Sequence, residues 1–476
     1  MNLFTICYLI LFLFLGGCHR PVSHGEIRFA LSQPPLNLDP RYATDAVSER
    51  INHLLYRSLV AFDSHSRPIP DLATWVEDSP THFRFSLVSD SIRFHDTEVL
   101  TSRDVAATYR SILELKDSPH SAEFSNILEI RSLDDRTLDF YLKRPDKDFP
   151  SRMVLGVMPA FLITQGHDFA HHPVGCGPLK FVSWQNALVL ERLGDQQRFV
   201  LQDVKDPTVR VLKLVRGEVD LLQGDLPPEM VAYLKGIKTI QVKEIPGSNF
   251  SYMGFNAQDP VLNDVRVRKA VALSIDRQAI LRYAMVGGSR EAGAILPPEH
   301  WAGNADLIAY EYDPVSAKEL LREAGVGLPL KLVYKTSTDP QRVRLATIMQ
   351  SQMQAAGIDL EIRSLDWGTF FNDIKRGDFQ LYGLTWVGIR TPEIYRLAFH
   401  SEDVPPRGSS RGRYSDPVLD KLIDEEDWQG ATRRVHEQLP YVPLWYEGQF
   451  VAMRSGLKDF APRADGNWDS LATIHY

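Results

Sequence analysis

The stretch that decides the fold runs from residue 331 to 386 and reads KLVYKTSTDPQRVRLATIMQSQMQAAGIDLEIRSLDWGTFFNDIKRGDFQLYGLTW. Residues 331–334 are typical of a strand. Asp339-Pro340 suits a helix start, with Asp as N-cap and Pro at the first helical position. Apolar residues then recur at helical spacing, and Gly357 is expected to end the helix: Val343, Ala346, Met349, Met353 and Ala356.

The pattern then repeats. Residues 358–362 alternate apolar and polar side chains, as in a strand with one buried face. Asp366 is placed to cap a short helix that Gly377 ends, and residues 379–386 predict the next strand. The order strand, helix, strand, helix, strand predicts an α/β lobe.

Similar signals extend outward from this stretch. Asp264 precedes one predicted helix, and Asp313-Pro314 begins another that Gly325 ends. The first half is more strand-like, because residues 83–87 and residues 92–94 alternate. Residues 101–104 then predict a helix start.

Length and composition limit the class of protein. The chain has 476 residues, which suggests two or three packed units. Hydrophobic residues make up 44% and charged residues 24%, as in ordinary globular proteins. The net charge of −8 argues against a nucleic-acid partner, which favours a basic face.

The N-terminus predicts export. Residues 3–15 form an apolar run that is too short for a bilayer span of about 20 residues but fits a secretory signal. Unlike a typical secretory signal, this run is not preceded by Lys or Arg. The alternative to a cleaved signal peptide is a short membrane anchor that stays on the protein. The following Leu15-Gly16-Gly17-Cys18 resembles a bacterial lipobox, with Cys18 as the lipidated residue. We therefore expect a signal peptide at 1–17 and a lipidated linker at 18–25; the alternative is a chance cysteine near an ordinary cleavage site.

The sequence lacks the common catalytic, metal-binding and phosphate-binding motifs that we searched for. There is no Gly-x-Ser-x-Gly, His-Glu-x-x-His or phosphate-binding Gly-x-x-x-x-Gly-Lys-Ser/Thr motif. Cys7 and Cys18 are both expected to be used at the N-terminus, which leaves Cys176 without a disulfide partner. His171-His172 is better explained as a solvated loop than as a metal site. We expect neither catalysis, nor a metal, nor a cofactor.

Several segments resemble one family, the family 5 extracellular solute-binding proteins, which are the oligopeptide-, dipeptide- and nickel-binding receptors of ABC importers. The similar segments follow the family's order along the chain: Pro68–Trp75, Phe83–Val105, Gly175-Cys176-Gly177-Pro178, Phe255–Arg277, Tyr312–Gly325 and Leu439–Leu444. One difference is that Val418–Glu437 is shorter than the corresponding family segment.

The resemblance implies two α/β lobes of the periplasmic-binding-protein fold, with an extra subdomain in the first lobe. By analogy, residues 26–52, 173–250 and 445–476 form lobe I, residues 53–172 form the extra subdomain, and residues 253–444 form lobe II. It also implies a monomeric lipoprotein of the cell envelope or periplasm that binds a peptide or peptide-like solute in an interlobe cleft. Its partners would be an ABC permease and its ATPase, with no nucleic acid.

Candidate ligand-binding residues follow from the same resemblance and from the rule that ligands lie beyond the carboxyl ends of strands. The first group is Trp386, Val387, Gly388, Ile389 and Arg390. Peptide-binding members carry an Asp here that pairs with the ligand's α-amine, whereas this chain has Ile389 followed by Arg390. Arg390 is interpreted as an anion clamp or as a solvated loop arginine.

The second group of candidates comes from two other segments. Leu36, Asn37 and Leu38, with Asp39, resemble the family's first ligand-facing loop, the alternative being a surface turn. Trp367 opens a helix beside a strand end. Like Trp386, it either lines the cleft or packs in the protein.

The sequence leaves two alternatives to an importer receptor. The first is a receptor of the same fold that acts in signalling or as a chaperone at the envelope, without import. The second is an enzyme on an α/β scaffold, such as a peptidase or glycosidase.

Overall fold

The computed structural model describes residues 25–115, 117–406 and 408–476, without the side chain of residue 122. The predicted signal peptide and Cys18 lie outside these residues, so they stay predictions. Within the described part of the chain, no helix has the length and apolar character needed to span a bilayer.

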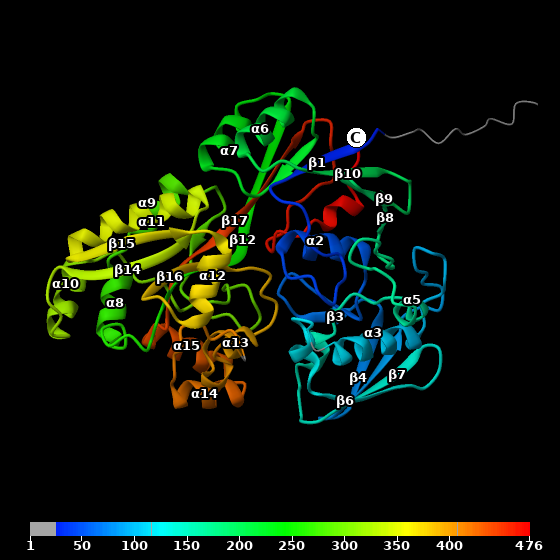
Figure 1. The fold of residues 1–476 in the computed structure, drawn as a ribbon, viewed down its shortest axis with the longest axis horizontal. Coiled ribbons are helices and arrows are strands. Elements are labelled where there is room, and N and C mark those ends of the chain that lie inside the picture. The colour runs from blue at the N-terminus through cyan, green and yellow to red at the C-terminus, as the bar shows by residue number, and fades with distance from the viewer. Residues whose placement is uncertain (1–24, 116, 407) are drawn as a thin grey trace, which may run out of the picture.

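One mixed sheet of 11 strands runs through the molecule, in the order β15-β14-β16-β12-β17-β11-β1-β10-β9-β8, with β13 paired to β17. Its centre is made by two long antiparallel strands, β12 (Ile240–Phe255) and β17 (Tyr441–Arg454). Figure 1 shows both strands passing from the upper part of the molecule to its left-hand part. These strands join two bodies that have separate hydrophobic cores.

The crossing point lies where the two strands change register, between Ile245 and Asn249. Gly247 sits here against the partner strand, because a Cβ on it would lie 1.7 Å from the Glu447 carbonyl oxygen. We therefore propose that the chain changes lobe near Gly247 and near Glu447, a few residues from the expected 250–253 and 444–445. Phe250, Trp445 and Tyr446 all pack in cores of the second lobe.

The first lobe builds its half of the sheet around β1 (Ile27–Leu31), which is parallel to β10 (Arg198–Asp203) and to β11 (Leu221–Gln223). β9 (Leu188–Arg192) follows β10 in the sheet, and β8 (Leu179–Trp184) is the edge strand of this lobe. Helices α2 (Ala46–Leu55), α6 (Pro207–Arg216) and α7 (Pro228–Lys235) complete this lobe. Asp45 caps α2 by accepting a hydrogen bond from the Ser48 N–H.

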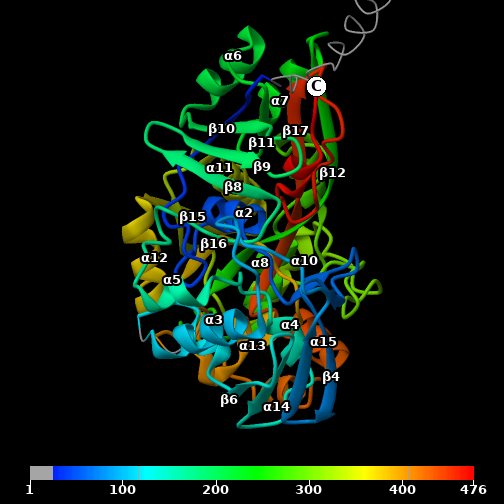
Figure 2. The same cartoon turned by 90° about the vertical axis from the view of Figure 1, so that its right-hand side faces the viewer.

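The extra subdomain has its own four-stranded antiparallel sheet and core, at the lower right of Figure 1. The sheet contains β4 (Ala73–Ser79), β5 (His82–Leu87), β7 (Thr137–Leu142) and β6 (Ile127–Ser132), in that order. It is completed by β2 (Val60–Phe62), β3 (Pro68–Pro70), α3 (Ser102–Glu114) and α4 (Phe149–Arg152). The helix α5 (Ala160–Thr164) packs Leu162 and Ile163 against the core of the first lobe. Figure 2 shows this sheet below the first lobe.

Two expectations for this region need correction. The boundary at 52/53 cuts through α2, whose residues Ile51, Leu54 and Leu55 belong to one core of the first lobe. Met158 and Phe169 also pack in that core, so we propose that the subdomain spans about 57–157. Residues 92–94 form an isolated bridge, Arg93 to Val99, rather than a strand.

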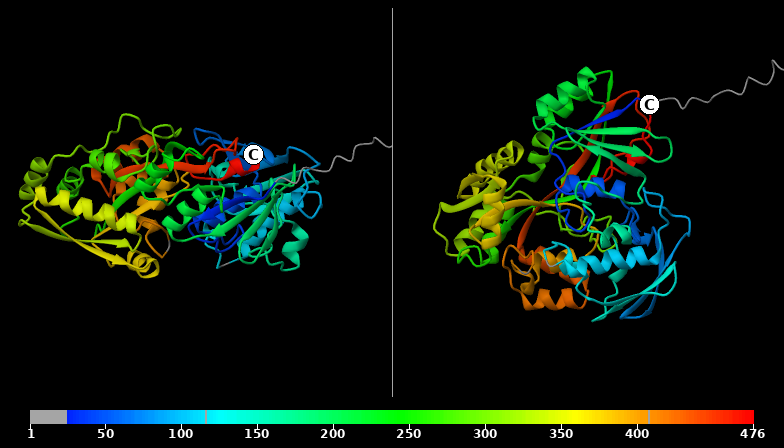
Figure 3. Two further views of the ribbon diagram at one scale, coloured as in Figure 1. Left: turned by 90° about the horizontal axis from the view of Figure 1, so that it is seen from above. Right: turned by 45° about the vertical axis from the view of Figure 1, so that its right-hand side comes forward.

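The second lobe confirms the elements predicted from residues 331–386. Strands β14 (Leu330–Ser337), β15 (Ile358–Leu365) and β16 (Leu381–Trp386) alternate with α11 (Pro340–Met353) and α12 (Trp367–Arg376). Asp339 and Asp366 accept N-cap hydrogen bonds, and Gly357 and Gly377 adopt positive φ at the helix ends. Seen from above, this lobe lies at one end of an elongated molecule (Figure 3).

The remaining second-lobe helices pack in the two cores of this lobe. They are α8 (Val265–Leu273), α9 (Arg277–Ala284), α10 (Pro314–Glu323), α13 (Ile394–Phe399), α14 (Pro417–Asp424) and α15 (Trp428–Gln438), with the short β13 (Arg290–Glu291). The Asp264 and Asp313 caps are confirmed, since both carboxylates accept backbone N–H groups. The shortened segment at 418–437 still forms α14 and α15.

Candidate functional site

The candidate site is the boundary between the lobes beside the crossing strands. Glu447 of β17 marks its hinge side, and its carboxylate accepts from the Ser251 hydroxyl at 2.5 Å and the Thr385 hydroxyl at 3.0 Å. Arg342 pairs with the same carboxylate at 2.7 Å. Burial opposes the charge, but Arg342 and the two hydroxyls hold the pKa of Glu447 below its usual range. Glu447 therefore stays negatively charged, and Arg342 of the second lobe balances its charge.

Arg390 reaches from the second lobe to the first. Its Nη2 lies 2.5 Å from the Nε2 of His53 on α2, and its guanidinium carbon lies 5.7 Å from the centre of the Phe62 ring. The His300 Nε2–H donates to the Arg390 carbonyl at 3.0 Å, since the other ring nitrogen of His300 accepts from the Ala302 N–H. Arg390 is thus a contact between the lobes and not a freely solvated loop arginine.

The two predicted tryptophans lie at the ends of one stack of side chains. Trp367 is 59% exposed and stacks on Phe371 at 5.5 Å between ring centres. The Arg411 guanidinium lies 5.4 Å from the Phe371 ring centre and 4.5 Å from that of Trp386. Trp386 is half-buried, and its indole N–H has no hydrogen-bond partner in the described structure. Sequence reasoning missed Arg411, which joins the two tryptophans.

The turn after Trp386 is partly open to solvent. Val387 is 47% exposed, and Gly388 is exposed with a positive φ of 69°. Ile389 is half-buried and packs against the aromatic core that also holds Trp386. The Gly388 N–H points toward the Asn249 side-chain oxygen at 3.4 Å, which ties the turn to β12.

The loop at 36–39 divides into exposed and buried residues. Leu36 is 72% exposed, whereas Leu38 is fully buried in the core of the first lobe. That Leu38 faces a ligand stays a prediction, which its side chain does not support because it packs against the lobe's own apolar residues. The Asn37 side-chain oxygen accepts from the Asp39 N–H at 2.8 Å, and the Ser48 hydroxyl accepts from the backbone N–H groups of Leu36 and Asn37.

Helix α2 supplies site residues that the sequence did not reveal. Its apolar face packs in the first lobe, while His53 faces Arg390 of the second lobe. Burial, together with Arg390 and Arg463, lowers the pKa of His53 to about 3. Burial also raises the pKa of Glu49, one turn earlier on the same helix. Polar residues in an amphipathic helix are usually solvated, so nothing in their spacing marks them as functional.

Further ion pairs and hydrogen bonds hold the lobes together. Arg344 of α11 pairs with Glu229 of α7 at 2.9 Å. The Trp301 N–H donates to the His65 carbonyl of the subdomain at 3.1 Å. The structure therefore shows the lobes in contact.

The structure does not favour catalysis at Cys176. Its thiol is buried, and burial raises its pKa to about 12, so the nucleophilic thiolate is disfavoured. No cluster of three His, Cys, Asp or Glu side chains suited to a metal occurs among the residues described.

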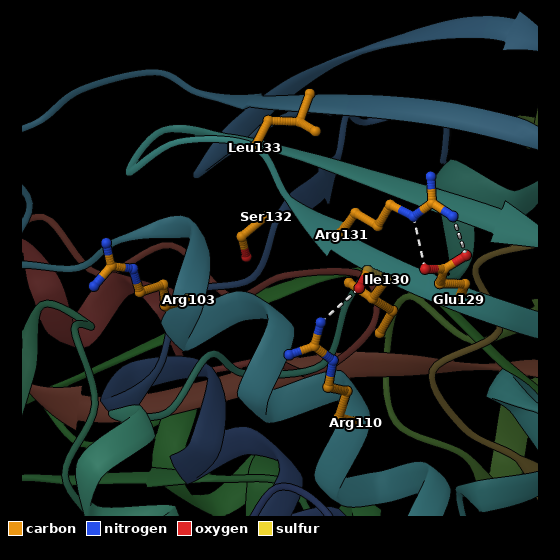
Figure 4. Close-up of a pocket in the computed structure, with 7 residues that line it drawn as sticks. All are labelled: Arg103, Arg110, Glu129, Ile130, Arg131, Ser132 and Leu133. Atoms are coloured by element: carbon orange, nitrogen blue, oxygen red, sulfur yellow. Dashed lines mark hydrogen bonds and ion pairs between the residues drawn. The ribbon is translucent and has the colours of Figure 1, made fainter.

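Two surface depressions lie away from the interlobe boundary. Figure 4 shows the larger, about 570 Å³, between α3 and β6 of the subdomain. Its Arg131 is engaged by Glu129 at 2.6 Å, and its Arg110 donates to the Ile130 carbonyl. The smaller, about 220 Å³, lies beside His95 and Phe181. Neither joins residues of both lobes.

Comparison with known proteins identifies the family. The sequence model described as "Bacterial extracellular solute-binding proteins, family 5 Middle" matches residues 67–403. A curated relative, the probable di/tripeptide-binding protein 5 of Pseudomonas aeruginosa, is 26% identical, over 87% of this chain and 89% of its own.

Solved structures of the same fold hold different solutes. The Helicobacter pylori ABC transporter-associated periplasmic binding protein DppA, in complex with the peptide STSA, matches with a TM-score of 0.80 and 22% identity, covering 95% of this chain and 98% of its own. The Agrobacterium protein AgaA, in complex with agropinic acid, matches with a TM-score of 0.77 and 22% identity, covering 95% and 98%. At these identities the likeness establishes the two-lobed fold alone.

Proposed function

Because this chain belongs to the bacterial extracellular solute-binding proteins of family 5, whose members are binding receptors and not enzymes, we propose that it captures a peptide or peptide-like solute between its lobes. We propose further that it delivers this solute to an ABC permease and its ATPase. The importer connection is supported by the relative whose solved structure is described as ABC transporter-associated.

The observation that carries the proposal is the pair of crossing strands. β12 and β17 link two bodies with separate cores, and close-packed glycine at the crossing leaves little side-chain bulk between them. Such a link allows rigid-body closure. A solute that contacts both lobes binds the closed form better and shifts the population toward it.

The ligand class is the finer part of the proposal. The turn at Val387–Arg390 carries no carboxylate, and Arg342 balances the charge of the nearby Glu447. A ligand ammonium buried here without a counter-charge would be destabilised by several kcal/mol. We therefore propose a solute whose amine is blocked, or one that carries an acidic group at that end.

Anchoring completes the proposal. Leu15-Gly16-Gly17-Cys18 supports lipidation at Cys18 after removal of residues 1–17. The protein would then be held on a membrane surface in the cell envelope by its acyl chains.

Small-angle scattering combined with calorimetry tests the receptor mechanism. The purified protein is titrated with a library of short peptides and their N-acetylated forms. Any compound that binds should also reduce the radius of gyration at saturation. Tight binding without compaction would refute lobe closure, and the absence of binding by every compound would refute the peptide-like ligand class.

A further inference from the structure

Arg50 lies on the face of α2 that carries His53, three residues away. Residues spaced by three in a helix are neighbours on its surface. Since His53 contacts Arg390 of the second lobe, this face is turned toward that lobe. The opposite face, with Val47, Ile51 and Leu54, packs in the core of the first lobe.

Arg50 is a half-buried cation that packs on an aromatic ring but has no hydrogen-bond or ion-pair partner among the described residues. Its guanidinium carbon lies 5.6 Å from the centre of the Trp468 ring, and a Cβ on Gly466 would lie 2.8 Å from its Nη2. Across the described residues it makes neither a hydrogen bond nor an ion pair. Other arginines of the first lobe are engaged: Arg28 by Asp220, Arg41 by Asp39 and Arg192 by Asp195.

Two acids act on Arg50 through their charge, but neither forms an ion pair with it among the described residues. Burial lowers the pKa of Arg50, and Asp225 and Asp465 offset this only in part. The Asp225 carboxylate accepts from the Ser32 hydroxyl at 2.6 Å, and that of Asp465 accepts from the Asn467 side chain at 2.9 Å.

The position of Arg50 relative to the sheet also indicates a ligand. Ser32 follows β1 and Asp225 follows β11, and these two strands are parallel neighbours. Ligands of α/β sheets lie beyond such carboxyl ends. Gly466, which lies against the Arg50 guanidinium, accepts a hydrogen bond at 2.9 Å from the side chain of Gln223, the last residue of β11, so Arg50 lies near the same edge of the sheet.

We infer that Arg50 holds a carboxylate of the bound solute on the first-lobe side of the boundary. Lobe closure over a neutral group would leave a desolvated cation unpaired, whereas a carboxylate can accept two parallel N–H bonds from the planar guanidinium. The inference rests on the proposed function and makes its ligand class more specific: the solute is an acid.

The other arginines at the boundary are less suited to this role. Arg390 is engaged by His53 and Phe62. Arg411 lies between the rings of Phe371 and Trp386 and points toward the Tyr252 hydroxyl at 3.4 Å. Arg342 is paired with Glu447.

Calorimetry with matched alanine peptides tests the inference. Di- and trialanine, free and N-acetylated, are compared as C-terminal acids and as C-terminal amides. The wild-type protein should bind the acids about 10- to 100-fold more tightly than the amides, as expected for a hydrogen-bonded charge. Arg50→Gln should bind acid and amide equally, and Arg50→Lys should keep part of the preference. Arg198→Gln, at an exposed arginine paired with Glu191, is the control and should behave as wild type.

The outcomes separate the two proposals. Equal binding of acid and amide by the wild type, or an unchanged preference in folded Arg50→Gln, overturns the role of Arg50 while the receptor function stands. Equal weakening of acid and amide by Arg50→Gln shows a merely structural role and also overturns it. If none of these peptides binds the wild type, the peptide-like ligand class fails and the inference fails with it.

Discussion

The contact between His53 and Arg390 predicts a contribution from His53 that lowers solute affinity in mild acid. The Arg390 guanidinium donates to His53 Nε2 at 2.5 Å, which only the neutral imidazole can accept. With the lobes in contact, burial and the nearby Arg390 and Arg463 lower the pKa of His53 to about 3. When the lobes part and His53 meets water, its pKa should return to about 6.5.

The sign and size follow from these two values. Above pH 6.5 the imidazole is neutral in both forms, and the contact contributes fully to closure. Below pH 6.5 the open form binds a proton that closure must release, so closure weakens until about pH 3, where the closed form is protonated as well. At pH 5.5 the loss relative to pH 7.5 is about 1.4 kcal/mol, or about tenfold in affinity.

Two acids near His53 change the pH dependence of lobe closure in the direction opposite to His53. Burial raises the pKa values of Glu49 and Asp469. Both carboxyls therefore bind protons more readily with the lobes together, so acid favours closure through them. The share of His53 is obtained only as a difference between wild type and a variant.

His53→Gln is the matched variant, because its amide oxygen can accept from Arg390 but does not titrate. Calorimetry at pH 5.5, 6.5 and 7.5 with the tightest-binding library compound should show about tenfold more acid weakening in the wild type than in His53→Gln. Equal pH dependence in the two proteins would refute the reasoning. Circular dichroism at each pH checks that both stay folded.

Three further predictions test other parts of the molecule. Cys18→Ser should abolish lipidation and move the protein from the detergent phase to the aqueous phase; unchanged partitioning would contradict the anchor. N-acetylated short peptides should bind at least as tightly as their free-amine forms, and a preference for the free amine by tenfold or more, about 1.4 kcal/mol, would show that an acid compensates for the missing aspartate. Leu38→Ala should lower the free energy of unfolding by about 3 kcal/mol, since Leu38 is fully buried. Leu36→Ala, at an exposed residue of the same loop, should change it by less than about 0.5 kcal/mol; comparable losses in denaturant melts would contradict this assignment.

Local signals in the sequence determined the secondary structure of the second lobe. Asp339 and Asp366 cap helices because a short carboxylate reaches the first free N–H groups, and Gly357 and Gly377 end them because they accept positive φ. These effects act within a few residues, so they can be found without the fold. The resemblance along the chain added the two-lobed architecture and the binding function.

Tertiary structure decided which residues form the boundary between the lobes. His53 and Arg390 are 337 positions apart, and only the crossing of β12 and β17 brings α2 beside the turn after β16. The same packing places Leu38 in a core although its neighbour Leu36 is exposed. It also leaves Arg50 without an ion pair among the described residues, although Asp225 and Asp465 act on it through their charge. Contacts between side chains so far apart in the sequence depend on how the helices and strands pack together. A local pattern of residues does not predict that packing.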